Sequence, residues 1–357
     1  MNDRRVWAAV LILAVGFAAA PPLFSHDIYS YVDYARLGAL HGLDPYVHPP
    51  AAEPFDPAYA SVTWIDATSA YGPLFTLATY PLAWLPVWAA VVALKLAAAA
   101  SVLAIAVLTA RIAPARGVSP LGAAAFVALN PVVLLQVVGG GHNDAIAVLA
   151  ATIGVAAILT SREGAGGVAF VTAFALKPPA ALAAPFALLA SANARVALLP
   201  QRGGAKGPNA ARVGSLGRLL LGTAVAALAT GAVAYAAFGW DWLGAIGLAG
   251  ENQGRTTHMS IPITAARLTG LDPTAVRAAA LALFAVATIY LLARTWQGHD
   301  WIRNAAWATF ALLLATAWLL PWYLIWALPL VALSRDRPLQ LLTLGLTGFQ
   351  LFARVPL

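Results

Sequence analysis

The chain has 357 residues, of which 61% are hydrophobic and only 10% are charged, and its mean hydropathy is +0.78. Soluble domains average about 25% charged and about 45–50% apolar residues, so this composition excludes a water-soluble globular protein. The absence of cysteine excludes disulfides, thiolate nucleophiles, iron–sulfur clusters and cysteine-bound zinc. The apolar residues fall in blocks of membrane-spanning length, which predicts an all-α integral membrane protein. In such a protein a net charge of +7 reflects cytoplasmic loops and anionic headgroups rather than nucleic acid.

The first predicted membrane helix covers Val6–Phe24 and follows two basic residues, Arg4 and Arg5. Small residues near its end resemble a signal-peptide cleavage site, but two prolines would follow the cut, so we favour an uncleaved helix. The next 48 residues, 25–72, contain six acidic residues and one arginine. The positive-inside rule therefore predicts that residues 25–72 form a large first extracytoplasmic loop.

The rest of the chain predicts further membrane helices, and we treat residues 1–357 as one transmembrane domain with about nine to eleven spans. An interfacial helix is expected over Pro73–Leu85. Residues 191–218 carry five basic residues and no acid, which predicts a cytoplasmic loop, and residues 239–273 form a second extracytoplasmic loop. The predicted spans are Val87–Ala110, Pro120–Val138, Ala145–Thr160, Leu219–Phe238, Thr274–Arg294, Asn304–Leu320, Pro321–Leu333 and Pro338–Phe352.

The segment Gly166–Ala190 is unusual because both of its ends are predicted to be cytoplasmic. Its middle is interrupted by Lys177-Pro178-Pro179. Broken helices are tolerated in membranes where they line a cavity, so we predict two half-helices that meet near the outer face. A single crossing is the alternative.

This topology places the unusual polar residues on the extracytoplasmic side, together with five of the six histidines. Polar groups beside or within a membrane are costly, and a functional site is their default explanation. We therefore predict one outward-facing polar cavity. The residues concerned are His26, Asp27, Asp44, Tyr46, His142, Asn143, Asp144, Lys177, Asn252, Gln253, Arg255, His258, Trp322 and Tyr323.

Structural explanations compete with the functional one at several of these positions. Asp27 could cap a helix predicted over Ile28–Leu40, although its place at the lip of the cavity favours catalysis. Asp144 could lie at the positive end of the helix Ala145–Thr160. Lys177 could snorkel or pair with a carboxylate, but its position in a broken intramembrane segment favours an anion site.

Other residues are more readily structural. Asp44-Pro45-Tyr46 resembles a turn, since Asp-Pro favours turns. Trp322 and Tyr323 are typical interface anchors, with sugar stacking as the alternative. Lys95 and Arg36 are interpreted as snorkelling or surface residues.

Several chemistries have no motif in the sequence. It contains no nucleotide-binding phosphate loop, no Rossmann glycine fingerprint, no zinc-protease helix and no nucleophile elbow. The histidines also lack a tight metal-ligand spacing. We therefore expect no nucleotide or cofactor and no metal, with a metal site assembled across loops as the alternative, and an activated substrate that the membrane delivers.

These residues and motifs resemble the GT-C superfamily of membrane glycosyltransferases, in particular the actinobacterial polyprenyl-phosphate-mannose-dependent mannosyltransferases that build phosphatidylinositol mannosides and lipomannan. The resemblance covers most of the chain, although the chain is short for that group. The motifs that carry it, in chain order, are His26-Asp27, Tyr31-x-x-Tyr34-x-Arg36, Asp44-Pro45-Tyr46, Tyr71-Gly72-Pro73, Asn130-Pro131, Gly141-His142-Asn143-Asp144, Lys177-Pro178 and Pro321-Trp322-Tyr323.

The resemblance implies an inverting glycosyltransferase of the plasma membrane, with a polyprenyl-phosphate sugar as donor and a glycolipid or glycan as acceptor. Asp27 would be the general base, and His26 would orient Asp27 or the acceptor. Lys177, Arg255 and His258 would stabilise the leaving phosphate. The residues expected to contact the sugar or the acceptor are Tyr31, Asp44, Tyr46, His142, Asn143, Asp144, Asn252, Gln253, Trp322 and Tyr323.

Mannose is the expected sugar, with arabinose or another hexose as alternatives. A transporter or flippase for a lipid-linked sugar would need the same phosphate site, and it would also need a route to both membrane faces. A membrane scaffold would leave the one-sided clustering of polar residues unexplained.

Overall fold

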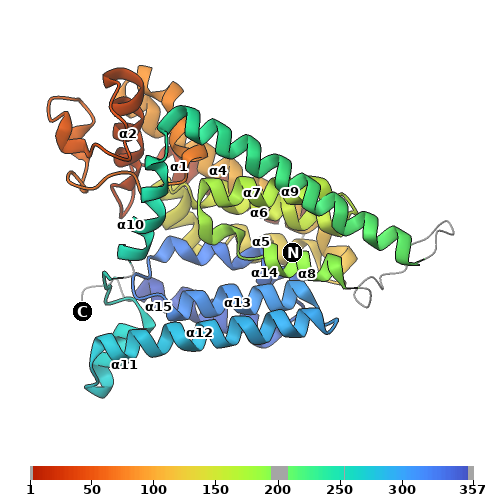
Figure 1. The fold of residues 1–357 in the computed structure, drawn as a ribbon. Helices are drawn as coiled ribbons and strands as arrows, with labels where there is room; N and C mark the ends of the chain where they lie inside the picture. The colour runs from red at the N-terminus through yellow and green to blue at the C-terminus, as the bar shows by residue number, and fades with distance from the viewer. Residues whose placement is uncertain (1–2, 194–207, 253, 353–357) are drawn as a thin grey trace.

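The computed structural model describes residues 3–193, 208–252 and 254–352. All regular elements in these ranges are helices, as Figure 1 shows. The first half contains α1 (Asp3–Ala19), α2 (Asp27–His41), η1 (Pro50–Ala52), η2 (Tyr59–Ser61), α3 (Pro73–Thr79), η3 (Tyr80–Trp84), α4 (Val87–Ile112), η4 (Ala113–Arg116), α5 (Pro120–Ala128), η5 (Val133–Val138), α6 (Asp144–Leu159), α7 (Glu163–Leu176), η6 (Pro178–Ala181) and α8 (Ala184–Ala192). The second half contains α9 (Pro208–Phe238), η7 (Asp241–Leu243), α10 (Gly244–Asn252), α11 (Ile261–Thr269), α12 (Pro273–Trp296), α13 (Trp301–Ala315), η8 (Pro321–Trp326), α14 (Leu328–Leu333) and α15 (Arg337–Phe352).

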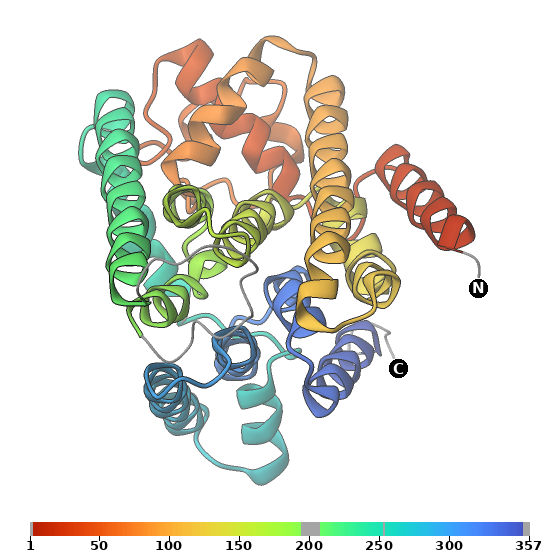
Figure 2. The ribbon, with the colours of Figure 1, turned by 90° about the vertical axis from the view of Figure 1, so that its right-hand side faces the viewer.

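Three helical segments within the described ranges are long and apolar enough to cross a membrane. They are Val87–Arg116, which is α4 with η4, Ser215–Phe238, which is part of α9, and Pro273–Trp296, which is α12. Figure 2 shows α1, α9 and α12 at the rim of the bundle. Large apolar side chains of α9 and α12 face outward, among them Leu228, which is 75% exposed, and Leu283, which is 70% exposed. Water would penalise this surface and lipid would not, so these helices suggest a membrane protein. The other predicted spans correspond to shorter or interrupted helices.

The first predicted loop is an ordered helical layer at one end of the bundle, at the upper left in Figure 1. Its main element is α2, which confirms the helix expected over Ile28–Leu40. Gly42 ends α2 in the left-handed conformation, with φ of +67°. Ile28, Tyr31 and Val32 lie on one face of α2 and are buried in the core, so this layer is held by apolar packing.

The segment Pro120–Val138 does not form one regular helix. α5 ends at Ala128, and the chain breaks at Asn130-Pro131 before the π-helical η5. A proline disfavours the helical conformation of the residue that precedes it, which here is Asn130. The Asn130 side chain accepts a hydrogen bond from the backbone N–H of Val132 at 3.0 Å. The proline therefore accounts for the break in this predicted span.

The predicted interruption at Lys177 is confirmed. α7 ends at Leu176, and Lys177 is extended, with φ of −161° and ψ of 107°. Glu163 at the start of α7 pairs with Arg218 of α9 at 2.9 Å. Asn193, just after α8, donates to the carbonyl of Trp296 at the end of α12. The two half-helices therefore begin and end near the same end of the bundle, with the break between them.

Lys95 and Arg36 are not the surface residues that we expected. Lys95 is 1% exposed, and its Nζ donates to the carbonyls of Ala20 and Pro21 just after α1. The last carbonyls of a helix lack partners within the helix, and the lysine supplies one. Arg36 pairs with Asp56 at 2.8 Å and is only partly exposed. The surface interpretation was therefore wrong for both residues, because the fold brings each side chain to partners 20 or more residues away in the sequence.

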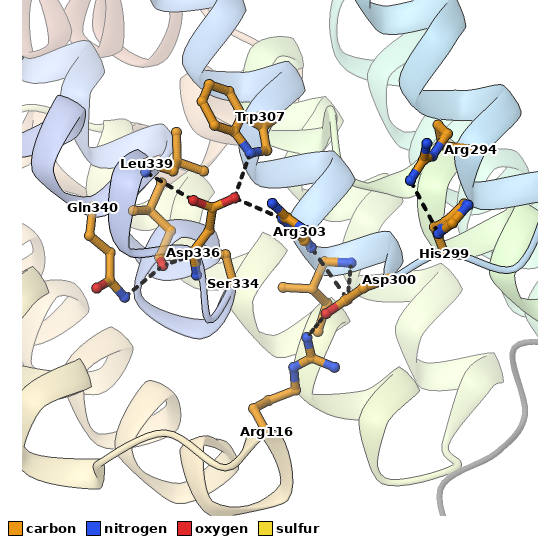
Figure 3. Close-up of polar contacts among 12 residues, drawn as sticks. Arg116, Arg294, His299, Asp300, Arg303, Trp307, Ser334, Asp336, Leu339 and Gln340 are labelled. Carbon is orange, nitrogen blue, oxygen red and sulfur yellow. Dashed lines mark hydrogen bonds and ion pairs between the residues drawn. The ribbon is translucent and has the colours of Figure 1, made fainter.

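A second group of polar contacts lies at the end of the bundle away from α2, and Figure 3 shows it in close-up. Asp300 caps α13 and pairs with Arg116. Asp336 accepts from Arg303 at 2.7 Å and from the indole of Trp307 at 2.8 Å. The first contact joins η4 to the turn that precedes α13, and the other two join α13 to the turn that precedes α15.

Candidate functional site

A cavity of about 910 Å³ opens between the α2 layer and the helical bundle. Its walls come from the first loop, the break at Lys177, the region of α9 and α10, and the segment from α13 to η8. The predicted site residues that line it are His26, Asp27, Lys177, Arg255, Trp322 and Tyr323. Residues from four distant parts of the sequence therefore meet at one cavity, which includes six of the fourteen polar and aromatic residues that we expected there.

Asp27 is the first residue of α2 and lines the cavity. The Ser25 hydroxyl accepts a hydrogen bond from the backbone N–H of Asp27 at 3.2 Å. The carboxylate accepts from the Trp64 indole at 3.1 Å through Oδ1, and its Oδ2 lies 3.9 Å from His142 Nδ1. Burial raises the pKa of Asp27, and the Trp64 hydrogen bond and the Lys177 charge oppose this shift. A carboxylate with a raised pKa is suited to accept a proton near neutral pH.

The turn before α6 places His142 beneath the cavity. Its ring stacks on Trp322 with a centroid distance of 3.7 Å and an interplanar angle of 16°. The Tyr31 hydroxyl lies 3.5 Å from His142 Nδ1. Gly141 permits the turn, since its φ is +70° and an added Cβ would lie 2.3 Å from Ile28 Cδ1. His142 thus connects Asp27 to Trp322 of η8.

Lys177 pairs with the residues at the start of α6. Its Nζ donates to Asp144 Oδ2 at 2.7 Å and to Asn143 Oδ1 at 3.3 Å. The other oxygen of Asp144 accepts from the Trp326 indole at 2.6 Å. Lys177 also lies 5.3 Å from the ring centroid of Tyr323. The ammonium group therefore has a fixed position on the cavity wall.

Arg255 lies across the cavity, between two tryptophans. Its guanidinium carbon is 4.8 Å from the ring centroid of Trp64 and 5.8 Å from that of Trp318. Guanidinium groups favour such positions because the face of an aromatic ring is negative. Arg255 therefore links the segment between α10 and α11 to the segment between α2 and α3.

Other predicted site residues lie elsewhere. Tyr46 belongs to a separate apolar cluster with Phe238, and its hydroxyl donates to the Tyr71 carbonyl at 2.9 Å. Asp44 accepts from the Tyr46 backbone at 2.8 Å, as expected of a turn. His258 is exposed and is not among the lining residues of the cavity.

Three more of the predicted residues lie beside the cavity or at the edge of the described chain. Tyr31 is 2% exposed and lies behind the cavity wall, where its ring packs against that of Tyr71 with a centroid distance of 4.8 Å. Asn252 is the last residue of α10. Gln253 lies outside the described residues.

Sequence reasoning missed the aromatic residues that complete the cavity wall. Tyr34 and Tyr71 stand in motifs that carry the family resemblance, but no motif marks the three tryptophans, whose only signal is the high total of 12 in the sequence. Their partners lie up to 182 residues away in the sequence, so only the fold brings them together. These residues are Tyr34, Trp64, Tyr71, Trp318 and Trp326.

Carboxylates that could hold a metal are sparse around the cavity. Within residues 3–193, 208–252 and 254–352 no group of three or more histidine, aspartate or glutamate side chains is placed to hold a metal ion. Of the two aspartates at this site, Asp144 already has partners on both oxygens. The site therefore presents one available carboxylate and two cations, an arrangement suited to proton abstraction beside an anion.

Two family models match the chain. Residues 1–193 match the N-terminal domain of alpha-(1->6)-mannopyranosyltransferases, and residues 260–355 match the MptB C-terminal domain. The first match includes Asp27, His142 and Lys177, and the second includes Trp322. Arg255 falls between the two matches.

Curated relatives carry the same description. Alpha-(1->6)-mannopyranosyltransferase A of Mycobacterium tuberculosis is 33% identical over 187 residues, which cover 51% of this chain and 34% of that protein. Alpha-(1->6)-mannopyranosyltransferase A of Corynebacterium glutamicum is 30% identical over 262 residues, which cover 68% of this chain and 50% of that protein. The chain thus spans half or less of the length of these relatives. No solved structure matches it.

Proposed function

Because the chain belongs to the alpha-(1->6)-mannopyranosyltransferase family, we propose that it transfers mannose from a polyprenyl-phosphate sugar to a glycolipid or glycan acceptor on the extracytoplasmic face of the plasma membrane. The observation that carries the proposal is the placement of one carboxylate, Asp27, and two cations, Lys177 and Arg255, on the wall of one cavity. A base for the acceptor and a site for the leaving phosphate are the two things that this transfer needs.

In the proposed reaction Asp27 removes the proton from an acceptor hydroxyl. The hydroxyl oxygen forms a bond to the anomeric carbon on the side opposite the phosphate, and the bond from that carbon to the phosphate oxygen breaks. The leaving phosphate keeps the electron pair, so its negative charge grows in the transition state. Lys177 and Arg255 stabilise that charge, and His26 orients the acceptor at the cavity wall.

The apolar part of the cavity supports a lipid-linked donor. Beyond the polar residues, its wall is formed by side chains of α7, α9 and α10, including Phe174, Ala227 and Ile246. α9 is one of the rim helices with an outward apolar face. A polyprenyl chain could therefore lie between this wall and the bilayer while its phosphate reaches Lys177.

A GT-C-like bundle with about nine to eleven spans and an outward-facing cavity belongs to the same proposal. It is supported by the acidic α2 layer at one end of the molecule and by the arginines around Asp300 and Asp336 at the other. Under the positive-inside rule the cavity end then faces outward.

The test of the proposal is transfer of radiolabelled mannose from synthetic polyprenyl-phosphate-mannose to membrane lipid acceptors. We expect Asp27→Asn to lower kcat by about 10²–10⁴-fold, because the amide cannot accept the proton. Asp66→Asn, in the same acidic loop but not in the cavity wall, is the matched control and should retain transfer. Wild-type rates in the Asp27→Asn protein would contradict the assignment of the base, and a flippase would tolerate that change.

A further inference from the structure

Trp64 holds one oxygen of the Asp27 carboxylate. The indole Nε1 donates to Oδ1 over 3.1 Å, from a residue 37 positions further along the chain. An indole N–H is only a donor, so it can pair with a carboxylate but cannot compete with it for a proton. The other oxygen, Oδ2, lies on the side of His142. The two oxygens therefore differ: Oδ1 accepts the indole hydrogen bond, and Oδ2 is left to accept a proton.

Trp64 is itself held in place from the second extracytoplasmic segment. Arg255 lies over its ring at 4.8 Å, and Trp318 packs against the same ring with a centroid distance of 6.3 Å and an interplanar angle of 70°. The segment that carries Arg255 is fixed by Thr257, whose backbone N–H donates to the carbonyl of Ala317 at 3.1 Å. The orientation of the indole is thus set by residues from three separate parts of the chain.

We propose that Trp64 is the positioning residue of this site, which orients Asp27 and stabilises its ionised form while Arg255 fixes the indole. This inference rests on the proposed function, in which Asp27 is the base. A hydrogen bond to a carboxylate favours the charged form, and the base must be charged to act. Trp64 does not contact the reacting atoms in this arrangement, and it acts only through Asp27.

The decisive variant is Trp64→Phe, which retains an aromatic ring beneath Arg255 and removes the N–H. We expect the titration midpoint of Asp27 to rise by about one pH unit or more. The midpoint can be followed in the purified protein by the infrared absorption of the protonated carboxyl, with the Asp27→Asn spectrum subtracted. The acid limb of the pH profile of kcat/KM should shift to higher pH by the same amount. The variant should therefore lose rate at low pH and regain it at higher pH.

The matched control is Trp307→Phe. Trp307 makes the same kind of bond, from an indole to the carboxylate of Asp336 at 2.8 Å, at the opposite end of the bundle (Figure 3). Its removal should leave the Asp27 midpoint unchanged. Arg255→Met keeps the N–H of Trp64 but removes the cation from its ring, and it should raise the midpoint by less than Trp64→Phe does.

The outcomes separate the two ideas. An unchanged Asp27 midpoint in Trp64→Phe overturns the inference, and so does a loss of rate that is equal at every pH. If the wild type transfers no mannose but the Asp27 midpoint still rises in Trp64→Phe, the role of the hydrogen bond stands and the proposed function is overturned.

Discussion

Two aspartates of α2 show how local environment separates chemically identical residues. Asp27 lines the cavity, whereas Asp33 is 1% exposed and neither of its oxygens has a hydrogen-bond partner among the described residues. Burial and the nearby Asp56 raise the pKa of Asp33 to about 7. Asp56 has the opposite shift, because Arg36 and His41 bond to its carboxylate and lower its pKa.

The raised pKa of Asp33 makes stability depend on pH. The folded state binds this proton more tightly than the unfolded chain, in which the pKa is 3.8. Stability therefore falls as the pH rises from about 4 to about 7 and stays at the lower level above that range. Asp33→Asn cannot ionise, so we expect it to raise the melting temperature in detergent by about 2–4 °C at pH 8 and to have little effect at pH 4.

Thermal scans of both proteins across this pH range check the prediction. A difference in melting temperature that does not vary with pH would contradict the raised pKa of Asp33, because it would mean that the folded and unfolded chains bind this proton equally. Asp56→Asn gives the contrast. It removes the carboxylate that Arg36 and His41 bind, whose pKa is lowered, and it should therefore lower the melting temperature at pH 7.

At the scale of single residues, the sequence could predict Asp27, Lys177 and Arg255 as cavity residues because charged groups beside apolar spans are unusual. It could not predict Trp64 or the pairing of Lys177 with Asp144. Those contacts depend on which loops and half-helices meet, and no local pattern encodes that choice.

At the scale of elements, glycines allow α7 and α9 to lie in direct contact. An added Cβ on Gly222 of α9 would lie 2.1 Å from the carbonyl oxygen of Gly164, and one on Gly167 would lie 2.5 Å from that of Leu219. Small residues permit such close approach between membrane helices, where van der Waals packing drives association. The half-helix that leads to Lys177 is thus fixed against the longest helix of the described chain.

Gly222→Ala should therefore destabilise the protein by about 1–3 kcal/mol, because a methyl group would meet the backbone of α7. Gly217→Ala in the same helix is the control, since no atom lies within 4 Å of the added Cβ. That change should be neutral or slightly stabilising, as alanine favours helix. Melting temperatures in detergent compare the two variants, and equal values would contradict the close contact.

Proline marks both helix breaks, but only one of them was predicted. We expected Lys177-Pro178-Pro179 to separate two half-helices, whereas the break at Pro131 falls inside a segment that we predicted as a single span. The packing of α7 on α9 was not predictable, because glycines at these positions look like any others in a sequence with 29 of them.

At the scale of the whole molecule, charge is divided between two ends. The acidic α2 layer and the cavity lie at one end, and the arginines around Asp300 and Asp336 lie at the other. Composition and charge asymmetry could predict this division, since both are properties of long segments. The spans were less predictable, because only three of the described helices have the length and hydropathy of a membrane crossing.

Labelling of single cysteines tests the orientation, and the absence of natural cysteine gives a clean background. Ala52→Cys in the first loop and Thr160→Cys after α6 are both at exposed positions, at opposite ends of the molecule. In intact cells a membrane-impermeant maleimide should label Ala52→Cys fully and Thr160→Cys only after permeabilisation. The reverse pattern would place the cavity in the cytoplasm.

The buried Lys95 has a mechanical consequence. From α4, its ammonium group donates to the carbonyls of Ala20 and Pro21, just after α1. Two residues later, the backbone N–H of Leu23 donates to the carbonyl of Gly139 at 3.0 Å. The short segment between α1 and Asp27 is therefore hydrogen-bonded to the core at two points. An outward movement of α1 would also displace Asp27, so under the proposed function we expect a lipid-linked donor to enter from the bilayer beside α9 and α10, which line the cavity.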